Sequence, residues 1–567
     1  MKLGSAIDRR TPAIVRGSHR FTDPELARIA ADRGAEDAWL AGFERHGHDV
    51  VHKVDGDFAV VLGDTRGRRF AAVDRFAIHP LCFRMDGGQL VAGERADDVA
   101  DSGADLDPQA IFEYLFFHVI PAPRTIFSGT SRLPAGHYAL MEDGALTVAR
   151  WWNPVFVEDA PVRFDELRGE FNQLLRECVA HRLDGRRVGC FLSGGTDSST
   201  VAGIVTELAG RPASTYSIGF DAQGYDEMAY ARIAARHFGT DHHEYYVTAD
   251  DVVASIPAIA AGYDQPFGNS SVVPAYYCAK MARDDGIELM LAGDGGDELF
   301  GGNTRYAKQR VLEGYASIPG AMRRSLVEPA LTGFPALERV PGIGKAVSYV
   351  RQARVPMPDR LEMYNLMLRL GLPEVLAPAF LAKIDVDEPQ RQQRAVYGAT
   401  SAHALINRML AYDWKYTLAD NDLPKVLGAA MRAGVCATFP LLDDRLVDFS
   451  LRLPPRFKLR GSKLRWFFKE ALRGFLPDAI LAKKKHGFGL PFGVWATRHP
   501  ALRDLAFDSI RSLGNRGIVR PDFVGRLIGE YLPQHPGYYG ELVWVLMTLE
   551  LWLHAREGST AERGLGA

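Results

Sequence analysis

The sequence predicts an α/β protein in which a β-rich N-terminal domain precedes a doubly wound sheet with helical additions. Three observations predict this fold class. Apolar runs separated by turn residues occupy residues 1–155. From residue 164 onward, helical patterns alternate with short apolar strands, which is typical of a parallel sheet between helices. Two segments rich in glycine and acidic residues follow predicted strands, where such sheets bind ligands.

The bulk properties exclude several classes of protein. A chain of 567 residues is too long for one core, and its length suggests about two to four structural units. Its net charge of −3 gives no electrostatic reason to expect a nucleic-acid or membrane partner. The first ten residues lack the apolar core of a secretory signal, and the five cysteines show no metal spacing. We therefore expect a cytoplasmic protein.

The N-terminal domain is expected to be built from short strands and one helix. Alternating and apolar runs predict strands at 58–62, 70–73 and 90–92. Residues 111–119 are apolar and aromatic at helical spacing, and Pro121 and Pro123 end that helix. An acidic connector at 157–161 marks the domain boundary. The chain is accordingly divided into domains at 1–155 and 156–557 and a flexible polar tail at 558–567.

The second domain opens with an amphipathic helix at 164–182 and continues with strands and helices in alternation. Strands are expected at 188–192, 214–220, 242–247 and 287–291, with helices at 200–208, 226–238 and 274–283. Residues 303 to about 480 are mainly helical, with Pro- and Gly-rich breaks. A doubly wound α/β sheet is the expected architecture.

The stretch at 191–199 (FLSGGTDSS) predicts a phosphate-binding turn between a strand and a helix. Its glycines let the backbone approach an anion, and the N–H groups of the helix start point at that anion. No Gly-Lys-Ser/Thr follows, so it is not a Walker loop. Asp197 can share the site with phosphates if a hard cation such as Mg2+ bridges them. The alternative is a polar turn that only caps the helix.

Two further loops carry charged groups. The segment at 292–302 (AGDGGDELFGG) places three acids among five glycines at the carboxyl end of a strand. One acid can hold a cation shared with Asp197 and another can face the reacting centre. The loop at 483–491 (KKKHGFGLP) is suited to reach a polyphosphate from the opposite side. The alternatives are a solvated acidic turn and a solvated basic turn.

The N-terminal domain carries four ordered segments, GDFAVV at 56–61, DRFAIHPL at 74–81, APRTIF at 122–127 and LPAGH at 133–137. In order and spacing they resemble the glutaminase domain and linker of class B asparagine synthetases. The resemblance implies a β sandwich of the N-terminal-nucleophile type, whose nucleophile is a cysteine directly after the initiator methionine. Here Lys2 holds that position and no cysteine precedes Cys82. We expect no glutamine hydrolysis and a domain retained as a structural or docking layer.

The second domain resembles the synthetase domain of the same family, which is of the ATP-pyrophosphatase type. The resemblance rests on SGGTDSS at 193–199, SIGF at 217–220, GDGGDELFGG at 293–302, PLLD at 440–443 and KHGFG at 485–489. It implies that the domain binds ATP and Mg2+, adenylates a carboxylate with release of pyrophosphate, and lets an amine displace AMP.

The resemblance also assigns site residues. The nucleotide and its pyrophosphate would be held by Leu192, Ser193, Gly194, Gly195, Asp197, Ser198 and Gly293, and the adenine framed by Ser217, Ile218 and Gly219. Asp197 and Asp297 would bind Mg2+. Lys485 would stabilise charge at the reacting phosphorus, and Asp294 is the candidate base for the incoming amine.

Departures from the family pattern bear on the substrate. Where relatives carry Glu and Arg before the PFLD turn, this chain has Cys436 and Thr438. Loss of that charged pair disfavours a small, doubly charged amino-acid substrate. With no ammonia source either, the amine is expected to be carried by the substrate itself. The missing glutaminase nucleophile, Asp294 and the helical stretch at 304–421 favour the lasso peptide cyclases, with a precursor peptide as substrate and a leader peptidase and a leader-binding protein as partners. The alternatives are an ammonia-dependent asparagine synthetase, a β-lactam-synthetase-like enzyme and a catalytically silent nucleotide-binding scaffold.

Overall fold

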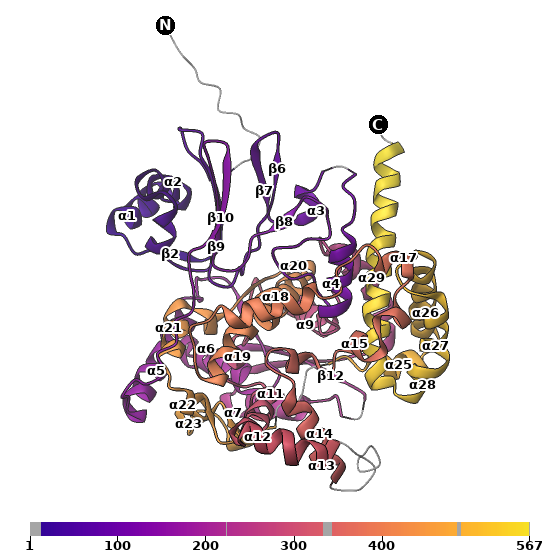
Figure 1. The fold of residues 1–567 in the computed structure, drawn as a ribbon. Coiled ribbons are helices and arrows are strands. Elements are labelled where there is room, and N and C mark those ends of the chain that lie inside the picture. The colour runs from indigo at the N-terminus through magenta and orange to yellow at the C-terminus, as the bar shows by residue number, and fades with distance from the viewer. Residues whose placement is uncertain (1–12, 102, 223, 333–342, 485–488, 566–567) are drawn as a thin grey trace.

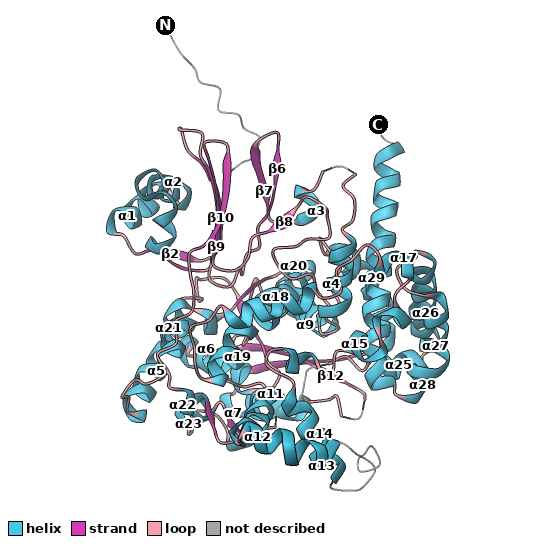
Figure 2. Ribbon diagram, viewed as in Figure 1, coloured by secondary structure: helices cyan, strands magenta, loops and turns pink. Residues whose placement is uncertain are grey.

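The computed structural model of the chain describes residues 13–101, 103–222, 224–332, 343–484 and 489–565 (Figure 1). Antiparallel strands occupy the chain up to Arg150, and a parallel sheet begins at Val188 (Figure 2). The predicted combination of an N-terminal sheet domain with a C-terminal α/β domain is confirmed.

Two antiparallel sheets form the N-terminal domain. The larger has the order β1-β4-β5-β9-β10 and the smaller β7-β6-β8, while β2 pairs with β3. Because side chains alternate along a strand, Val61 of β4 faces the smaller sheet and packs near Phe83, whereas Val60 faces the other way. The strands are β1 (Ile14–Arg16), β2 (His19–Phe21), β3 (Val54–Gly56), β4 (Ala59–Gly63), β5 (Arg69–Val73), β6 (Cys82–Asp86), β7 (Gln89–Gly93), β8 (Ser131–Arg132), β9 (His137–Glu142) and β10 (Ala145–Arg150).

Two helices that the sequence analysis does not predict cover the outer face of the larger sheet. They are α1 (Pro24–Arg33) and α2 (Ala35–His46), which bury Trp39 and Phe43 against the strands. Asp23 caps α1 by accepting hydrogen bonds from the backbone N–H groups of Glu25 and Leu26. A 3-10 segment (Gly47–Lys53) and the short helix α3 (Ala96–Val99) complete this part of the chain.

The helix predicted at 111–119 is observed as α4 (Pro108–Phe117), but it lies in the core of the C-terminal domain. Asp107 caps its start, and His118 ends it in the left-handed region. Its apolar side chains belong to the same buried cluster as those of the last helix, α29 (Pro536–Leu565). The hydroxyl of Tyr114 donates to the carbonyl oxygen of Val545 at 2.9 Å. The N-terminal part of the sequence therefore contributes α4 to a hydrophobic core of the C-terminal domain.

The C-terminal domain is built on a five-stranded parallel sheet with the order β13-β12-β11-β14-β15. The strands are β11 (Val188–Phe191), β12 (Ser214–Phe220), β13 (Asp241–Val247), β14 (Leu289–Leu291) and β15 (Cys436–Thr438). The order along the sheet reverses between β11 and β14. Ligands of such sheets bind at the carboxyl ends of the strands at this reversal, so the fold itself selects the loops after β11 and β14.

Helices cover both faces of this sheet, as expected for a doubly wound fold. Cys190 and Leu291 pack with α5 and α6, whereas Tyr216 and Met290 pack with α8, α9 and α20 (Leu423–Ala433). The helices up to the middle of the domain are α5 (Phe164–Ala180), α6 (Thr196–Ala209), α7 (Met228–Phe238), α8 (Ala249–Gly262), α9 (Val272–Asp284), α10 (Gly296–Phe300), α11 (Thr304–Glu313), α12 (Gly320–Met322), α13 (Glu328–Thr332), α14 (Ile343–Arg354), α15 (Leu366–Leu370), α16 (Leu372–Val375), α17 (Pro378–Leu381), α18 (Glu388–Gly398) and α19 (Leu405–Asp413).

The rest of the domain is also mainly helical. A π-helical turn (Trp414–Asp422) joins α19 to α20. The remaining elements are α20 (Leu423–Ala433), α21 (Asp444–Arg452), α22 (Pro455–Lys458), β16 (Leu459–Arg460), β17 (Lys463–Leu464), α23 (Trp466–Ala471), α24 (Asp478–Ala482), α25 (Phe492–Arg498), α26 (Pro500–Asn515), α27 (Pro521–Arg526), α28 (Leu532–Gln534) and α29. The backbone of α29 stays helical through Leu565, beyond the boundary that the sequence suggests at 557.

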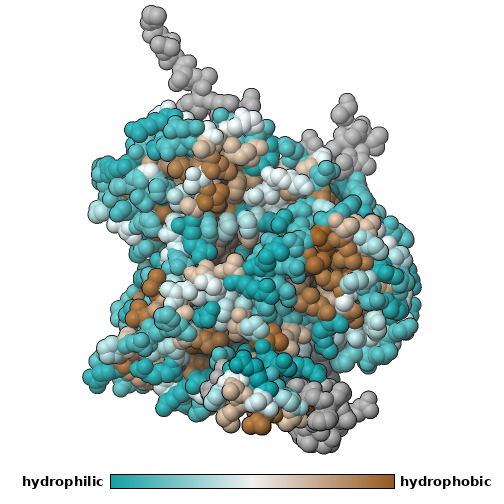
Figure 3. Space-filling model, in the orientation of Figure 1, coloured by the Kyte–Doolittle hydropathy of each residue, from teal (hydrophilic) through white to brown (hydrophobic). Residues whose placement is uncertain are grey.

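The face of the molecule in Figure 3 is largely hydrophilic, and its hydrophobic residues form separate patches. Within the described residues, none of the helices combines the length and the apolar character that crossing a membrane requires.

Candidate active site

The loop after β11 has the geometry of an anion site. The Ser198 hydroxyl lies 3.2 Å from the backbone nitrogen of Ser193 and 3.1 Å from the hydroxyl of that residue, which draws the loop into a tight turn. Gly194 has φ +65°, and a Cβ placed on it would lie 2.4 Å from the backbone nitrogen of Ala231. Only glycine fits there. The turn leads into α6, whose N-terminal N–H groups favour a bound anion.

The loop after β14 places carboxylates beside the first loop. Asp294 lies three residues after the end of β14, and Asp297 lies in the first turn of α10. Asp294 lies 3.8 Å from the ammonium group of Lys425 on α20. Burial raises the pKa of Asp294 to about 6, with Lys425 opposing that rise and Asp422 adding to it. A carboxylate with such a pKa can accept a proton near neutral pH.

A cavity of about 1240 Å³ joins the two loops. Ten of the twelve described residues to which the sequence assigns a role line it: Leu192, Ser193, Gly195, Asp197, Ser198, Ser217, Ile218, Gly293, Asp294 and Asp297. The other two are Gly194, which packs against α7 as described, and Gly219, which faces Tyr246 and Asp226. The structure therefore brings together residues that are up to about a hundred positions apart in the chain.

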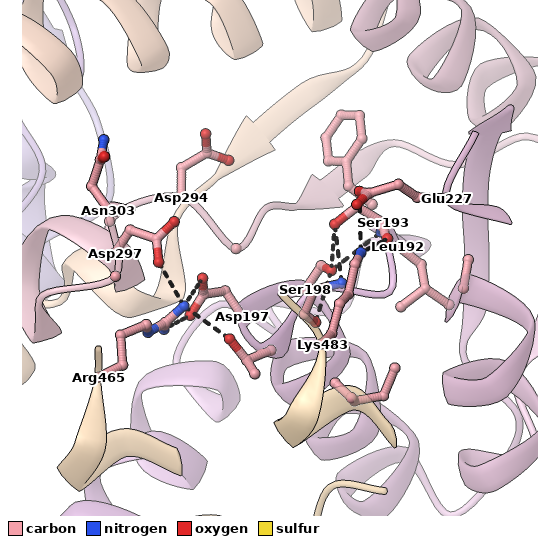
Figure 4. Close-up of a pocket in the computed structure, with 18 of the residues that line it drawn as sticks. Leu192, Ser193, Asp197, Ser198, Glu227, Asp294, Asp297, Asn303, Arg465 and Lys483 are labelled. Carbon is pink, nitrogen blue, oxygen red and sulfur yellow. Dashed lines mark hydrogen bonds and ion pairs between the residues drawn. The ribbon is translucent and has the colours of Figure 1, made fainter. Parts of the chain in front are cut away.

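Arg465 is a site residue that the sequence analysis misses. It lies between β17 and α23 and lines the same cavity. Its guanidinium donates to both carboxylate oxygens of Asp197 and, at 2.8 Å, to Oδ1 of Asp297 (Figure 4). The residues that the sequence assigns to a metal are thus joined by an arginine.

The basic loop contributes Lys483 to the described part of the cavity. Its ammonium group lies 3.3 Å from the carbonyl oxygen of Ser193 and 3.1 Å from Oε2 of Glu227 (Figure 4). Burial lowers the pKa of Lys483, and Glu227 opposes that effect. Lys485, the lysine to which the sequence assigns a catalytic role, lies outside the described residues.

The donor set fits Mg2+ only in part. Among the described residues, no group of three or more His, Cys, Asp or Glu side chains could hold a metal ion. Asp197 and Asp297 supply two carboxylates, which suits a magnesium ion that takes its other ligands from water and substrate phosphates. Binding of Mg2+ by Asp197 and Asp297 would therefore require a polyphosphate in the cavity.

The comparisons with known proteins agree with this geometry. A family model described as asparagine synthase matches residues 170–554. The chain belongs to the asparagine synthase family. A second model, described as a glutamine amidotransferase domain, matches residues 32–152. Membership of the asparagine synthase family makes the chain an ATP-dependent ligase.

Curated relatives of this asparagine synthase family member cover most of its length. A putative glutamine-hydrolysing asparagine synthetase of Mycobacterium bovis is 28% identical over 92% of this chain and 80% of its own. The glutamine-hydrolysing asparagine synthetase 1 of Bacillus subtilis is 22% identical over 90% of this chain and 79% of its own.

Two positions used to infer the substrate do not touch the cavity. Both residues lie on β15, which is an edge strand of the sheet. Cys436 is exposed, and Thr438 pairs with Leu291 of the neighbouring strand β14. Neither is among the described residues that line the cavity. The inference that the loss of this charged pair disfavours a small, doubly charged amino-acid substrate therefore gains no support from the described cavity lining, and it stays a prediction for this asparagine synthase family member.

Proposed function

We propose that this chain adenylates a carboxylate with ATP, releasing pyrophosphate, and joins it to an amine of the same peptide with loss of AMP. The product is a macrolactam between the peptide's N-terminal amine and an Asp or Glu side chain, as in lasso peptide cyclases. The observation that carries the proposal is the 1240 Å³ cavity in which the phosphate-type loop, two carboxylates and Asp294 meet. Typical small-ligand pockets measure about 300–1,000 Å³, so there is room for more than a nucleotide.

The chain's own residues divide into binding and proton-transfer groups. The turn at Ser193 and the start of α6 would hold the polyphosphate, and Asp197 and Asp297 would hold Mg2+ beside it. Ser217 and Ile218 line the part of the wall assigned to adenine. When bound, ATP turns the substrate carboxylate into a good electrophile.

Asp294 would take a proton from the ammonium group of the substrate, because the amine must be neutral before it can attack. Lys425 beside it keeps that carboxylate partly ionised near neutral pH. Lys485 is assigned to stabilising negative charge on the reacting centre by the family resemblance alone.

The amine is proposed to come with the substrate because the N-terminal domain offers no reactive thiol. Cys82 is the one cysteine before residue 156. Its side chain is fully buried, and burial raises the pKa of its thiol to about 12. A protonated, inaccessible thiol cannot attack glutamine. The two relatives are described as glutamine-hydrolysing, one of them as putative, so this domain is where the present chain is proposed to differ from them.

The test is a reaction of the purified chain with ATP, Mg2+ and a linear candidate core peptide that has a free N-terminus and an internal Asp or Glu. We expect AMP, pyrophosphate and a product lighter than the peptide by one water, with no dependence on glutamine. Asparagine formed from aspartate and ammonia, with no peptide product, would instead establish the ammonia-dependent synthetase. A lactam formed only from a small amino acid would establish a β-lactam-synthetase-like enzyme.

Asp197→Asn separates an enzyme from a silent scaffold. The variant should lose pyrophosphate release while keeping its fold, because Asn still fills the loop but carries no charge for the metal. A wild-type chain that binds ATP and releases no pyrophosphate with any of the three substrates would support the scaffold. The precursor peptide, leader peptidase and leader-binding protein stay predictions until such a product is found.

A further inference from the structure

Arg465 is held in place by more than its two carboxylate partners. Its backbone has φ +53°, a left-handed conformation that is rare for a residue with a Cβ. Its backbone N–H donates to the carbonyl oxygen of Gly301 at 3.1 Å. Its guanidinium lies 4.2 Å from the ring centre of Phe468, and the residue is 5% exposed. These contacts fix the position of the Arg465 guanidinium.

The surrounding residues leave little room beside the Arg465 guanidinium. A Cβ on Gly302 would lie 1.6 Å from Oδ1 of Asp297 and 2.6 Å from Cδ of Arg465. The Thr196 hydroxyl also accepts from the guanidinium, at 2.8 Å. The arginine thus occupies the space that joins the two carboxylates, and a dication placed there would meet a like charge at contact distance.

We propose that Arg465 acts as a built-in counter-ion that excludes a free divalent cation from Asp197 and Asp297 until a polyphosphate is bound. The inference rests on the proposed function for the assignment of these carboxylates to Mg2+. The guanidinium pairs with both carboxylates, and Lys469 adds a second positive charge that offsets the nearby Glu298, so the protein alone has little to offer a dication. A triphosphate brings enough negative charge for the arginine and the metal together. Metal and nucleotide are then expected to enter as one unit.

The experiment measures Mn2+ binding to the full-length chain without nucleotide, by the loss of the free-ion paramagnetic resonance signal. We compare wild type, Arg465→Gln, and Arg465→Gln combined with Asp297→Asn. Arg465→Gln should bind Mn2+ about tenfold tighter than wild type or more, because the competing charge is gone. The double variant should lose that gain. Arg473→Gln, which removes an exposed arginine from a surface pair with Glu470, is the matched control and should behave as wild type.

A thermal melt gives a second readout if Arg465→Gln is poorly folded. Mg2+ alone should raise the melting temperature of that variant and leave wild type unchanged, whereas Mg2+ with α,β-methylene-ATP should raise that of wild type. Tight Mn2+ binding by nucleotide-free wild type, or no gain in Arg465→Gln, would overturn the inference while leaving the ligase intact. Failure of the proposed function would appear differently, as wild type that melts unchanged with Mg2+ and the ATP analogue and forms no peptide product.

Discussion

The guanidinium of Arg182, just after α5, donates a hydrogen bond to the carboxylate of Asp57 in the N-terminal domain, and both side chains are buried. His79 approaches the other oxygen of Asp57 at 3.2 Å, and the backbone N–H of Ser18 donates to it at 3.0 Å. Burial opposes the charge on Asp57, but His79 and Arg182 together hold the pKa of that carboxyl well below its usual range. A buried ion pair therefore joins the two domains.

Replacing Arg182 with Met should destabilise the whole chain by about 3–5 kcal/mol, because it leaves the carboxylate of Asp57 buried without its guanidinium partner. Chemical denaturation followed by fluorescence measures the change. Arg452→Met is the control, since Arg452 pairs with Glu170 at the surface and such pairs are worth about 0–1 kcal/mol. Equal losses in the two variants would show that the buried pair has no special role in joining the domains.

Gly194→Ala should strongly weaken nucleotide binding, since a Cβ would collide with the backbone of α7 and push the loop open. Isothermal titration with an ATP analogue measures the affinity, which we expect to fall about a hundredfold or more, the effect of misplacing a positioned group. Gly210→Ala is matched to it. Gly210 has φ +60° with open space around it, so its variant should show only the backbone strain of about 1–2 kcal/mol in stability. Normal nucleotide affinity in Gly194→Ala would contradict the assigned role of the loop.

Asp294→Asn should slow amide formation by about 10²–10⁴ while keeping substrate-dependent exchange between ATP and pyrophosphate, because the base acts after activation. Asp294 works only when ionised, so the wild-type rate should fall tenfold per pH unit below its pKa of about 6. Initial rates between pH 5 and 8 measure the profile. The Asn variant should lose that inflection and Asp294→Glu should restore one. An inflection that persists in Asp294→Asn would assign the base to another group.

Lys458→Met should alter how stability depends on pH. Lys458 is 1% exposed, donates to Oδ1 of Asn407 at 2.8 Å, and has a pKa that burial lowers to about 7. Its folded pKa is below the unfolded value of about 10.4, so unfolding takes up a proton between these values. Wild type should therefore gain stability over Lys458→Met as pH rises from 7 to 10, by at most about 1.4 kcal/mol per unit.

Denaturation midpoints across that pH range test this prediction, with the exposed Lys383→Met as control. The control should run parallel to wild type. A Lys458→Met curve that also runs parallel to wild type would mean that Lys458 is charged in the folded protein.

Local sequence patterns predicted more of the fold than of the site. β12 occupies the residues predicted for it, because alternation and apolar runs are properties of neighbouring residues. Arg465 could not be found in this way, since its partners Asp197 and Asp297 precede it by 268 and 168 residues. The residues that flank Arg465 in the sequence form no motif that would mark it as a site residue. For α1, by contrast, the Asp-Pro pair at its start was a usable signal, since Asp23 caps it and Pro24 opens it.

A motif comparison does not show where in the fold a position lies. Cys436 and Thr438 differ from the family pattern, but β15 places them away from the described wall of the cavity, so their effect on the substrate stays a prediction. The strongest sequence inference about the site, the pairing of the loops after β11 and β14, followed from a general property of parallel sheets rather than from any single residue.

The docking of α4 limits how such a chain can be shortened. A protein that began at residue 156 would lack Phe112 and Tyr114, and the buried cluster that they share with α29 would be incomplete. Burial of each large apolar side chain in such a cluster contributes about 1.5–3 kcal/mol. The N-terminal part of the chain can therefore lack catalytic activity and still be required, because α4 completes a hydrophobic core of the C-terminal domain.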